Sequence, residues 1–273
     1  MSRSRIGLIV LLATLGIASF IQAQSAGERV LRPAHVPTHG GTSTASFRFC
    51  RVQFRTSLAG DGAGWYVDFP RADINLSLRL AQLTRTGVDW ENEGGDPAHV
   101  VIGLTDDQLA PCPFIMMSEV GGADLSDDEA AALGRYLRKG GFLWADDFWG
   151  SRAWRWWSTQ LARVLPPSEF PIVDLPADHP LYHTLFDVPD VPQIPNIGLW
   201  ESSHVTSERG ADSPVAKPRA ILDRSGRVMV FMTGDTDFGD AFERESESPD
   251  YFARFSVPAY QIGVNVILYA LTH

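Results

Sequence analysis

The sequence predicts an α/β protein built around a mostly parallel sheet. Apolar runs at 99–104 and 113–120 have the composition of strands buried on both faces, as strands of parallel sheets are. Residues 125–141 combine the start and stop signals of a helix, and an apolar strand at 142–145 follows at once. A helix joined so closely to a strand is half of a βαβ unit, the repeating element of parallel α/β folds.

The helix within 125–141 is defined by signals at both ends. Ser126 and Glu129 form a capping box, in which each side chain accepts a hydrogen bond from the backbone of the other. Acidic residues fill the first turn and basic residues the last, as the helix dipole favours. Gly140 or Gly141 then ends the helix in a left-handed cap.

The remaining elements follow from hydrophobic periodicity and turn signals. Residues 166–218 carry many prolines, which predicts irregular surface loops on the core and not a separate domain. The other expected elements are a strand over 47–54, a helix over 74–85 capped by Asp73, a helix over 151–165, two strands joined by a turn at Ser225-Gly226, and a helix over 258–273.

The N-terminus has the pattern of a secretory signal peptide. Arg3 and Arg5 precede an apolar run at 6–21, and small residues follow it. The run is short for a membrane span, which needs about 20 apolar residues. We therefore expect a signal peptide over 1–25 and a periplasmic or extracellular product without a membrane span. An uncleaved N-terminal anchor, with the domain facing outward, is the alternative.

The rest of the chain is expected to form one domain after a linker. Residues 26–45 are rich in Pro, Gly, Thr and His and lack periodicity, which is typical of a flexible linker. Residues 46–273 then form a single α/β domain. The chain has 273 residues and a formal net charge of −10, which argues against nucleic acid as a partner because phosphates are bound by clustered Lys and Arg.

Two cysteines are too few for a disulfide scaffold or a Cys-rich zinc module. Cys50 and Cys112 each border an apolar segment, so we interpret them as two separate buried small hydrophobic residues. In an oxidising compartment they could instead pair.

Three predicted strands run into acidic residues. In an open parallel sheet, ligands bind outside the carboxyl ends of the strands, so these carboxylates could gather at one edge. Such a cluster would suit Mg²⁺ or Ca²⁺, or could raise one pKa for acid–base chemistry. The competing interpretation is structural, because Asp is a preferred helix cap. The residues are Asp106 and Asp107, Asp146 and Asp147, and Asp235, Asp237 and Asp240.

Asp146 and Asp147 are the leading candidates, because adjacent charges after a buried strand need a compensating partner. Trp149 and neighbouring tryptophans could line a pocket beside them or could pack in the core. His179 and His183 lie four residues apart and could share a metal if helical, although a short turn fits equally well. The patterns of elbow-type serine hydrolases, P-loop enzymes and common zinc proteases do not occur in the sequence.

Five segments in order resemble a known bacterial family. They are FRFCRVQF, WYVDFPRAD, PFIMMSEVGGADLSDDEAAALGRYLRKGGFLWADDFWG, DHPLYHTLFDV and GVNVILYALT. The chain resembles the DUF4159 family, a domain of unknown function, over about residues 46–273. This family is grouped with class I glutamine amidotransferase-like folds, so the resemblance implies a flavodoxin-like three-layer α/β sandwich.

The resemblance does not imply glutamine hydrolysis. Where amidotransferases carry a nucleophile elbow with a Cys, this sequence has Ala145-Asp146-Asp147, without Cys or Ser. The late His-Pro-Glu motif of amidotransferases is matched only in part by His179-Pro180-Leu181, which lacks the Glu. Thiolate chemistry requires an activated Cys, so a functional amidotransferase is not expected.

Two hypotheses follow for the function. The first is a non-catalytic domain of the cell envelope that binds a small molecule or another envelope protein. Its candidate binding residues are Glu119, Asp146, Asp147, Trp149, Asp235 and Asp237. The second is a metal-assisted or carboxylate-based hydrolase acting on a carbohydrate or similar small substrate. Its candidate catalytic residues are Asp146, Asp147 and His179.

Overall fold

The computed structural model describes residues 46–92, 94–188 and 190–273. The predicted signal peptide and linker, residues 1–45, lie outside the described residues. The main sheet has seven strands in the order β3-β1-β4-β6-β9-β8-β7. These strands are β1 (Phe49–Gln53), β3 (His99–Gly103), β4 (Phe114–Ser118), β6 (Phe142–Phe148), β7 (Ile172–Asp174), β8 (Lys217–Leu222) and β9 (Val228–Gly234); β2 (Arg55–Thr56) and β5 (Ala123–Asp124) pair separately.

Five strands of the main sheet are parallel, and two are antiparallel at one edge. β3, β1, β4, β6 and β9 are neighbours in that order and all run in one direction. Counted along the chain, this is the order 2-1-3-4-5 of flavodoxin-like sheets. β8 and β7 continue the sheet with antiparallel pairing. The expected mostly parallel sheet is therefore confirmed, and the architecture fits a flavodoxin-like sandwich.

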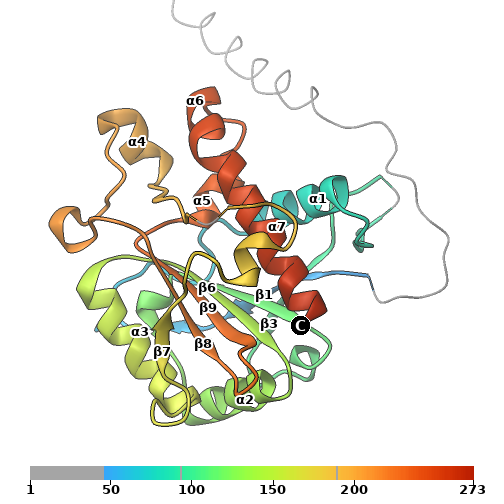
Figure 1. The fold of residues 1–273 in the computed structure, drawn as a ribbon, viewed down its shortest axis with the longest axis vertical. Coiled ribbons are helices and arrows are strands. Elements are labelled where there is room, and N and C mark those ends of the chain that lie inside the picture. The colour runs from blue at the N-terminus through green and yellow to red at the C-terminus, as the bar shows by residue number, and fades with distance from the viewer. Residues whose placement is uncertain (1–45, 93, 189) are drawn as a thin grey trace, which may run out of the picture. The chain divides into compact units, whose positions relative to one another are not determined.

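Helices cover both faces of the sheet (Figure 1). α1 (Arg71–Leu83), α5 (Phe238–Glu243) and α7 (Val257–Thr272) share one hydrophobic core with the sheet. α2 (Asp127–Arg138) and α3 (Gly150–Val164) share the core on the opposite face. The shorter segments are η2 (Asp107–Leu109), η3 (Val120–Gly122), η4 (Pro180–His183), α4 (Ile197–Ser203), η5 (Gly210–Asp212), α6 (Pro249–Tyr251) and the π-helical turn η6 (Phe252–Ser256).

The helix signals of the sequence are confirmed at α2. Glu129 donates its backbone N–H to Ser126 Oγ at 3.2 Å, and Ser126 donates its N–H to the Glu129 carboxylate at 2.7 Å. Gly140 has φ +106°, as a left-handed helix cap requires. The prediction that Asp73 caps α1 is wrong, because Asp73 lies inside the first turn, where its buried carboxylate pairs with Arg51.

The Pro-rich region 166–218 is largely irregular, as expected, but it also contributes to the sheet. Its segment β7 pairs with β8, and β8 begins within the same region. The sequence pattern gave no sign of β7, because the strand has only three residues and lies at the sheet edge.

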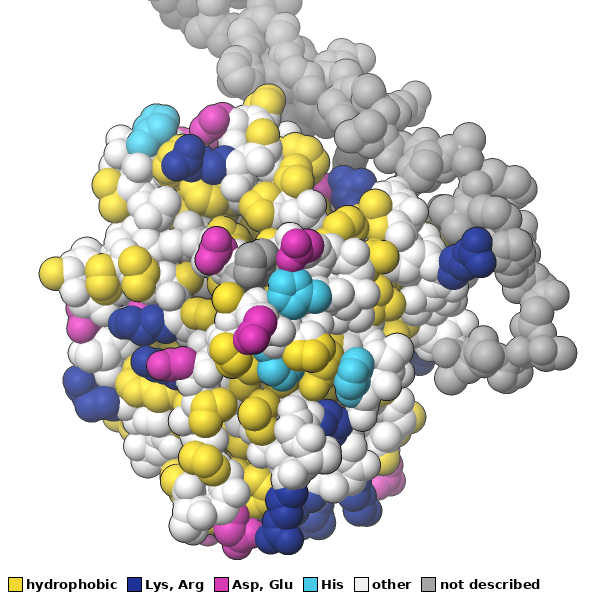
Figure 2. Space-filling view, viewed as in Figure 1, with side chains coloured by type: hydrophobic (Ala, Val, Ile, Leu, Met, Phe, Trp, Pro, Cys, Tyr) yellow, Lys and Arg dark blue, Asp and Glu magenta, His cyan; other side chains and the backbone are white. Residues whose placement is uncertain are grey.

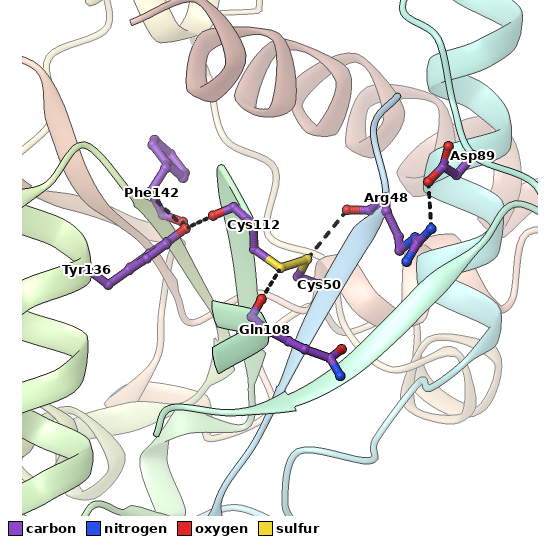
Figure 3. Close-up of a disulfide and its surroundings, with 7 residues drawn as sticks. All are labelled: Arg48, Cys50, Asp89, Gln108, Cys112, Tyr136 and Phe142. Atoms are coloured by element: carbon purple, nitrogen blue, oxygen red, sulfur yellow. Dashed lines mark hydrogen bonds and ion pairs between the residues drawn. A yellow bond between two sulfur atoms is a disulfide. The ribbon is translucent and has the colours of Figure 1, made fainter. Parts of the chain in front are cut away.

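Cys50 and Cys112 form a disulfide bond (Figure 3). The interpretation as two separate thiols is therefore wrong, although both residues are buried as expected. The bond joins β1 to the loop before β4. Tyr136 of α2 donates its hydroxyl to Cys112 O at 2.8 Å, which ties the same loop to the helix layer.

One described helical stretch, Pro249–Thr272, is long and apolar enough to cross a membrane by length and composition. In the fold, 61% of its most apolar window is buried. Its main part, α7, packs on the sheet and on α1 and α5, and contributes Ile262, Val266 and Ile267 to the core. It therefore serves as a core helix of this domain.

The disulfide predicts a measurable loss of stability on its removal. Cys50 and Cys112 are 62 residues apart, and cross-linking such a loop stabilises the native state by about 4 kcal/mol in the chain-entropy model. We expect Cys50→Ala/Cys112→Ala to lower the free energy of unfolding by about 2–4 kcal/mol in urea titrations. A reductant should destabilise the wild type and leave the variant unchanged. Equal stability of the two proteins would contradict the assignment.

Candidate functional site

A pocket of about 390 Å³ lies where the carboxyl ends of the parallel strands meet. Its walls come from the segments that follow β1, β4, β6 and β9 and from the loop after α4. Eight carboxylates line it, against two guanidinium groups, those of Arg209 and Arg244. The carboxylates belong to Asp61, Asp68, Glu119, Asp147, Glu208, Asp237, Asp240 and Glu243.

This concentration of one charge differs from the face shown in Figure 2, where acidic, basic and hydrophobic side chains are interspersed. The pocket has four times as many carboxylates as guanidinium groups and lies at the carboxyl edge, where open α/β sheets bind their ligands.

Left-handed backbone turns place three of these carboxylates. Asp68, Glu119 and Asp147 have φ values of 62°, 56° and 56°. For residues other than glycine this conformation costs roughly 1–2 kcal/mol each, and such residues cluster at functional sites. Asp68 lies in the segment after β1, Glu119 directly follows β4, and Asp147 is the last residue but one of β6. The three left-handed residues therefore bring acids from the ends of three strands to one pocket.

A β-bulge separates the two adjacent aspartates of β6. The pairing register with β9 shifts between Asp146 and Phe148, and Asp147 is the extra residue. Bulges re-aim side chains next to active sites. As a result Asp147 lines the pocket, whereas Asp146 is fully buried beneath it.

Asp146 is bound by the protein itself. Its Oδ2 accepts hydrogen bonds from the backbone N–H groups of Phe238 and Gly239 at 2.9 and 3.2 Å, and its Oδ1 accepts one from the Thr233 hydroxyl. Burial raises the pKa of Asp146 to about 7, although these donors oppose the shift. The carboxylate joins β6 to the start of α5 and is not among the pocket-lining residues.

Asp68, Asp147 and Asp237 form a compact group of buried carboxylates. One oxygen from each lies within 4.8 Å of the others. Asp147 accepts a hydrogen bond from Trp149 Nε1 at 2.9 Å, and Asp237 accepts one from the Asp240 backbone at 2.7 Å. Asp68 Oδ2 is buried and has no hydrogen-bond partner among the described residues. One of the three carboxylates therefore has an acceptor oxygen without a hydrogen bond among the described residues.

Gly239 makes room for this arrangement. A Cβ at position 239 would collide with Asp68 Oδ2, so only glycine allows the carboxylate to lie against the start of α5. A larger residue at position 239 would therefore displace the Asp68 carboxylate from its position.

The three carboxylates make one another harder to ionise. Burial raises the pKa of Asp68, and the nearby Asp240 adds to the shift. Burial and Glu119 raise the pKa of Asp147, and burial and Asp147 raise that of Asp237. These shifts have one physical cause, which is like charge held together away from water.

A second group of possible ligands shares Asp68. It contains Asp240 and Glu243, but both already contact Arg244, whose Nε lies 3.4 and 2.9 Å from their carboxylates. Asp240 also accepts from the Ile197 backbone. This side of the pocket therefore has its own cation, whereas the group of Asp68, Asp147 and Asp237 has none among the described residues within salt-bridge distance.

Glu119 stands apart from both groups in the same pocket. Its Oε2 accepts a hydrogen bond from the Ala63 backbone at 3.1 Å. Burial raises the pKa of Glu119 to about 7, although that hydrogen bond opposes the shift. The carboxyl can therefore accept or release a proton near neutral pH.

The remaining predicted binding residues divide between pocket and scaffold. Trp149 lines the pocket and orients Asp147. Asp235 does not line it: its carboxylate accepts from the Gly150 backbone at 2.7 Å and pairs with Lys217 at 2.9 Å. Asp235 therefore fixes the start of α3.

His179 lies at the opposite side of the sheet from the pocket, near the amino-terminal end of β9. Its ring packs 5.7 Å from that of Tyr269, whose hydroxyl accepts from the first residue of β9, Val228. Its Nδ1 accepts from the Leu181 backbone at 3.2 Å, so it caps η4. The structure thus separates His179 from the acidic pocket, and His183 pairs with Asp187.

The expected gathering of all strand-end acids occurs only in part. Asp147, Asp237 and Asp240 share the pocket, whereas Asp106 and Asp107 border a different one beside α2. Asp106 accepts from the Gly103 backbone at 2.6 Å, which is the structural role that the competing interpretation assigned to such acids. β3 is the outermost parallel strand, so its end lies away from the centre.

Sequence reasoning missed four of the lining acids, Asp61, Asp68, Glu208 and Glu243. Asp68 follows β1 by 15 positions, in a segment with no strand pattern. The available signal was topological: β1 is a parallel strand, so acids in the loop after it return to the same edge. Glu208 comes from the Pro-rich region, which gives no such signal.

Comparison with known proteins places nearly the whole described domain in one family. A family model described as "Domain of unknown function (DUF4159)" matches residues 48–271. No curated protein matches the chain.

The divergent roles of the two β6 aspartates predict opposite effects on stability. Asp146→Ala leaves three buried donors without an acceptor, at a cost of about 1–3 kcal/mol each. We therefore expect this variant to have a free energy of unfolding lower by at least about 3 kcal/mol. Asp147→Asn removes one of several repelling charges and keeps an acceptor for Trp149. In EDTA at pH 8, urea titration should find it as stable as the wild type or more so. A large loss in Asp147→Asn would contradict this division.

The raised pKa values predict a pH dependence of stability in EDTA. Several native carboxyls, those of Glu119 and Asp240 in the pocket and of Asp146 beneath it among them, bind protons more tightly than unfolded carboxyls, whose pKa is about 4. Their contribution is complete below pH 4 and is lost as pH rises through the native pKa, which is about 7 for Glu119 and Asp146 and about 6 for Asp240. The free energy of unfolding should fall by at least about 1 kcal/mol from pH 5 to pH 7.

Variants test which carboxyl groups cause this dependence of the free energy of unfolding on pH. Asp147→Asn/Asp237→Asn should flatten it, because two of the interacting groups are gone. Asp107→Asn, an exposed strand-end aspartate outside the pocket, should keep the wild-type slope. The same slope in all three proteins would show that the pocket is not its source.

Proposed function

Because the chain belongs to the family of unknown function DUF4159, we propose its role from the geometry of the acidic pocket. The domain is a ligand-binding module that holds a divalent cation, Mg²⁺ or Ca²⁺, between Asp68, Asp147 and Asp237. The observation that carries this proposal is Asp68 Oδ2, a buried carboxylate oxygen without a partner among the described residues, in a group within 4.8 Å. Carboxylate oxygens at such mutual distances suit hard cations, which bind oxygen at 2.0–2.6 Å.

A bound cation resolves the two costs of this arrangement. It accepts the free lone pairs of Asp68, whose burial without a partner is otherwise expensive. It also converts the repulsion among three carboxylates into attraction toward one centre. Two nearby arginines do not replace such a cation. Arg244 pairs with the carboxylates of Asp240, Glu243 and Glu247. Arg51 pairs with Asp73, and although its charge favours the ionised form of Asp68, it makes no ion pair with that carboxylate among the described residues.

We propose that the domain works outside the cytoplasm, as an exported protein of the cell envelope. The disulfide between Cys50 and Cys112 supports this, because structural disulfides form and persist in oxidising compartments. The basic and apolar N-terminal segment supports it as well. The partner of the module would be a small molecule or another envelope protein.

We also propose a kinship with class I glutamine amidotransferase-like folds without their activity. The 2-1-3-4-5 order of the parallel strands is compatible with it. Both cysteines of the chain are in the disulfide, so a thiolate nucleophile is lacking. At the end of β6, where the resemblance places the nucleophile, the chain carries one structural and one pocket-lining aspartate.

A metal-assisted hydrolase is the second candidate function. Glu119 favours it, because this carboxyl lies in the pocket, outside the group of three aspartates, with a pKa of about 7. A group of that kind can take a proton from a water molecule held by a cation. The binding module remains the first candidate, because the unpartnered Asp68 Oδ2 supports a cation site, whereas no feature of the described residues fixes a reaction.

The proposal predicts direct cation binding. Isothermal titration of EDTA-treated protein should find Mg²⁺ or Ca²⁺ binding, and the cation should raise the melting temperature. Asp68→Asn should weaken the affinity at least about tenfold, because removing a charged ligand does at least as much as removing an outer-shell partner. Gly239→Ala should also weaken it, because the added methyl displaces the Asp68 carboxylate.

The matched control is Asp107→Asn, which removes one strand-end carboxylate outside the pocket and should leave the affinity unchanged. Wild type that binds neither cation, or variants of Asp68 and Asp107 with equal affinity, would contradict the proposed site.

A further inference from the structure

We infer that the ligand of the cation-loaded pocket is a neutral polyhydroxylated molecule, that is, a sugar without charged groups. This inference rests on the proposed cation site and adds the chemical class of what binds there. Three features of the pocket carry it, which are its residual charge, the hydrogen-bonding character of its lining and an exposed aromatic ring at its mouth.

Residual charge disfavours an anionic ligand. The eight carboxyl groups exceed the two guanidinium groups by six, so the pocket keeps a negative charge with one divalent cation bound, even when Glu119, whose pKa is about 7, is protonated. The guanidinium groups are not free to offset it for a ligand: Arg209 lies 3.5 Å from Asp61, and Arg244 contacts three carboxylates. A phosphate or carboxylate ligand would therefore enter against repulsion, in a pocket where water screens charge poorly.

The lining is composed mainly of hydrogen-bond acceptors. Carboxylates accept and, when ionised, cannot donate, so they select ligands rich in donors. Side-chain donors of the lining are engaged within the protein: Asn196 donates to Glu208 at 2.8 Å, and Trp149 Nε1 donates to Asp147 at 2.9 Å. Glu119 uses one oxygen for the Ala63 backbone and leaves the other for a ligand. Hydroxyl groups supply donors to carboxylates, and their oxygens can also complete the shell of a hard cation.

Tyr66 offers an apolar surface at the mouth of this polar pocket. It lines the pocket, yet its side chain is 59% exposed, which is unusual for a ring of that size. The Trp65 ring lies 6.2 Å away and edge-on to the Tyr66 ring, and Phe69 in turn packs 5.7 Å from Trp65. A sugar ring has an apolar face of C–H groups that can pack on an aromatic ring while its hydroxyls point to polar partners.

The volume of the pocket limits the size of the ligand. At about 390 Å³ it lies at the small end of ligand pockets, which span roughly 300–1,000 Å³. One or two sugar rings fit this size, so a longer glycan would be bound through its end or through a short segment.

The test is a glycan array probed with full-length mature protein in Ca²⁺, in Mg²⁺ and in EDTA. Neutral glycans should be bound with either or both cations, and binding should be lost in EDTA. Titration with the best neutral glycan should then show at least a tenfold loss of affinity in Tyr66→Ala, with the cation affinity unchanged. Leu58→Ala is the matched control: Leu58 is 97% exposed on a neighbouring loop but does not line the pocket, so its removal should have no effect.

The remaining outcomes overturn the inference in distinguishable ways. Cation-loaded protein that binds only anionic glycans, or no glycan, shows that the ligand class is wrong while the cation site stands. Protein that binds spermidine in EDTA, and loses it when Ca²⁺ is added, shows that the carboxylates select an organic cation. Absence of cation binding by titration removes the proposed function, and this inference falls with it.

Discussion

Three buried carboxylates within 4.8 Å of one another are the constraint on which the rest of the structure depends. Like charges held away from water are unstable unless they take up protons or a cation, and the raised pKa values of Asp68, Asp147 and Asp237 express that cost. A fold that keeps such a group must be stabilised elsewhere. The disulfide, the buried pair of Arg51 and Asp73, and two continuous hydrophobic cores provide that support.

The topology explains why these acids meet although they are far apart in the chain. β1, β4, β6 and β9 are adjacent and parallel, so the segments after them converge on one edge. Local features of the backbone then determine which of these acids line the pocket. The bulge at Asp147 turns it into the pocket and leaves Asp146 buried beneath, and Gly239 opens the space that Asp68 occupies. The geometry of the site therefore depends on the order of the strands, on one β-bulge and on a glycine that leaves space for a side chain.

The sequence predicted what is locally encoded and missed what depends on tertiary structure. α2 could be placed from Ser126, Glu129 and Gly140, because caps are local signals. The buried strands followed from their apolar runs. The different roles of Asp146 and Asp147 could not be predicted, since a one-residue bulge decides them. Asp68 was missed because its loop has no pattern of its own, and its place depends on β1 being a parallel strand between β3 and β4.

Anomalous diffraction from crystals grown with Mn²⁺, a cation that takes the same oxygen ligands, would locate the proposed cation directly. We expect one strong anomalous peak among Asp68, Asp147 and Asp237, within coordination distance of all three carboxylates. The peak should be absent from crystals of the Asp68→Asn variant grown in the same way. A wild-type crystal without a peak there, or with its only peak at Asp106 and Asp107, would contradict the account.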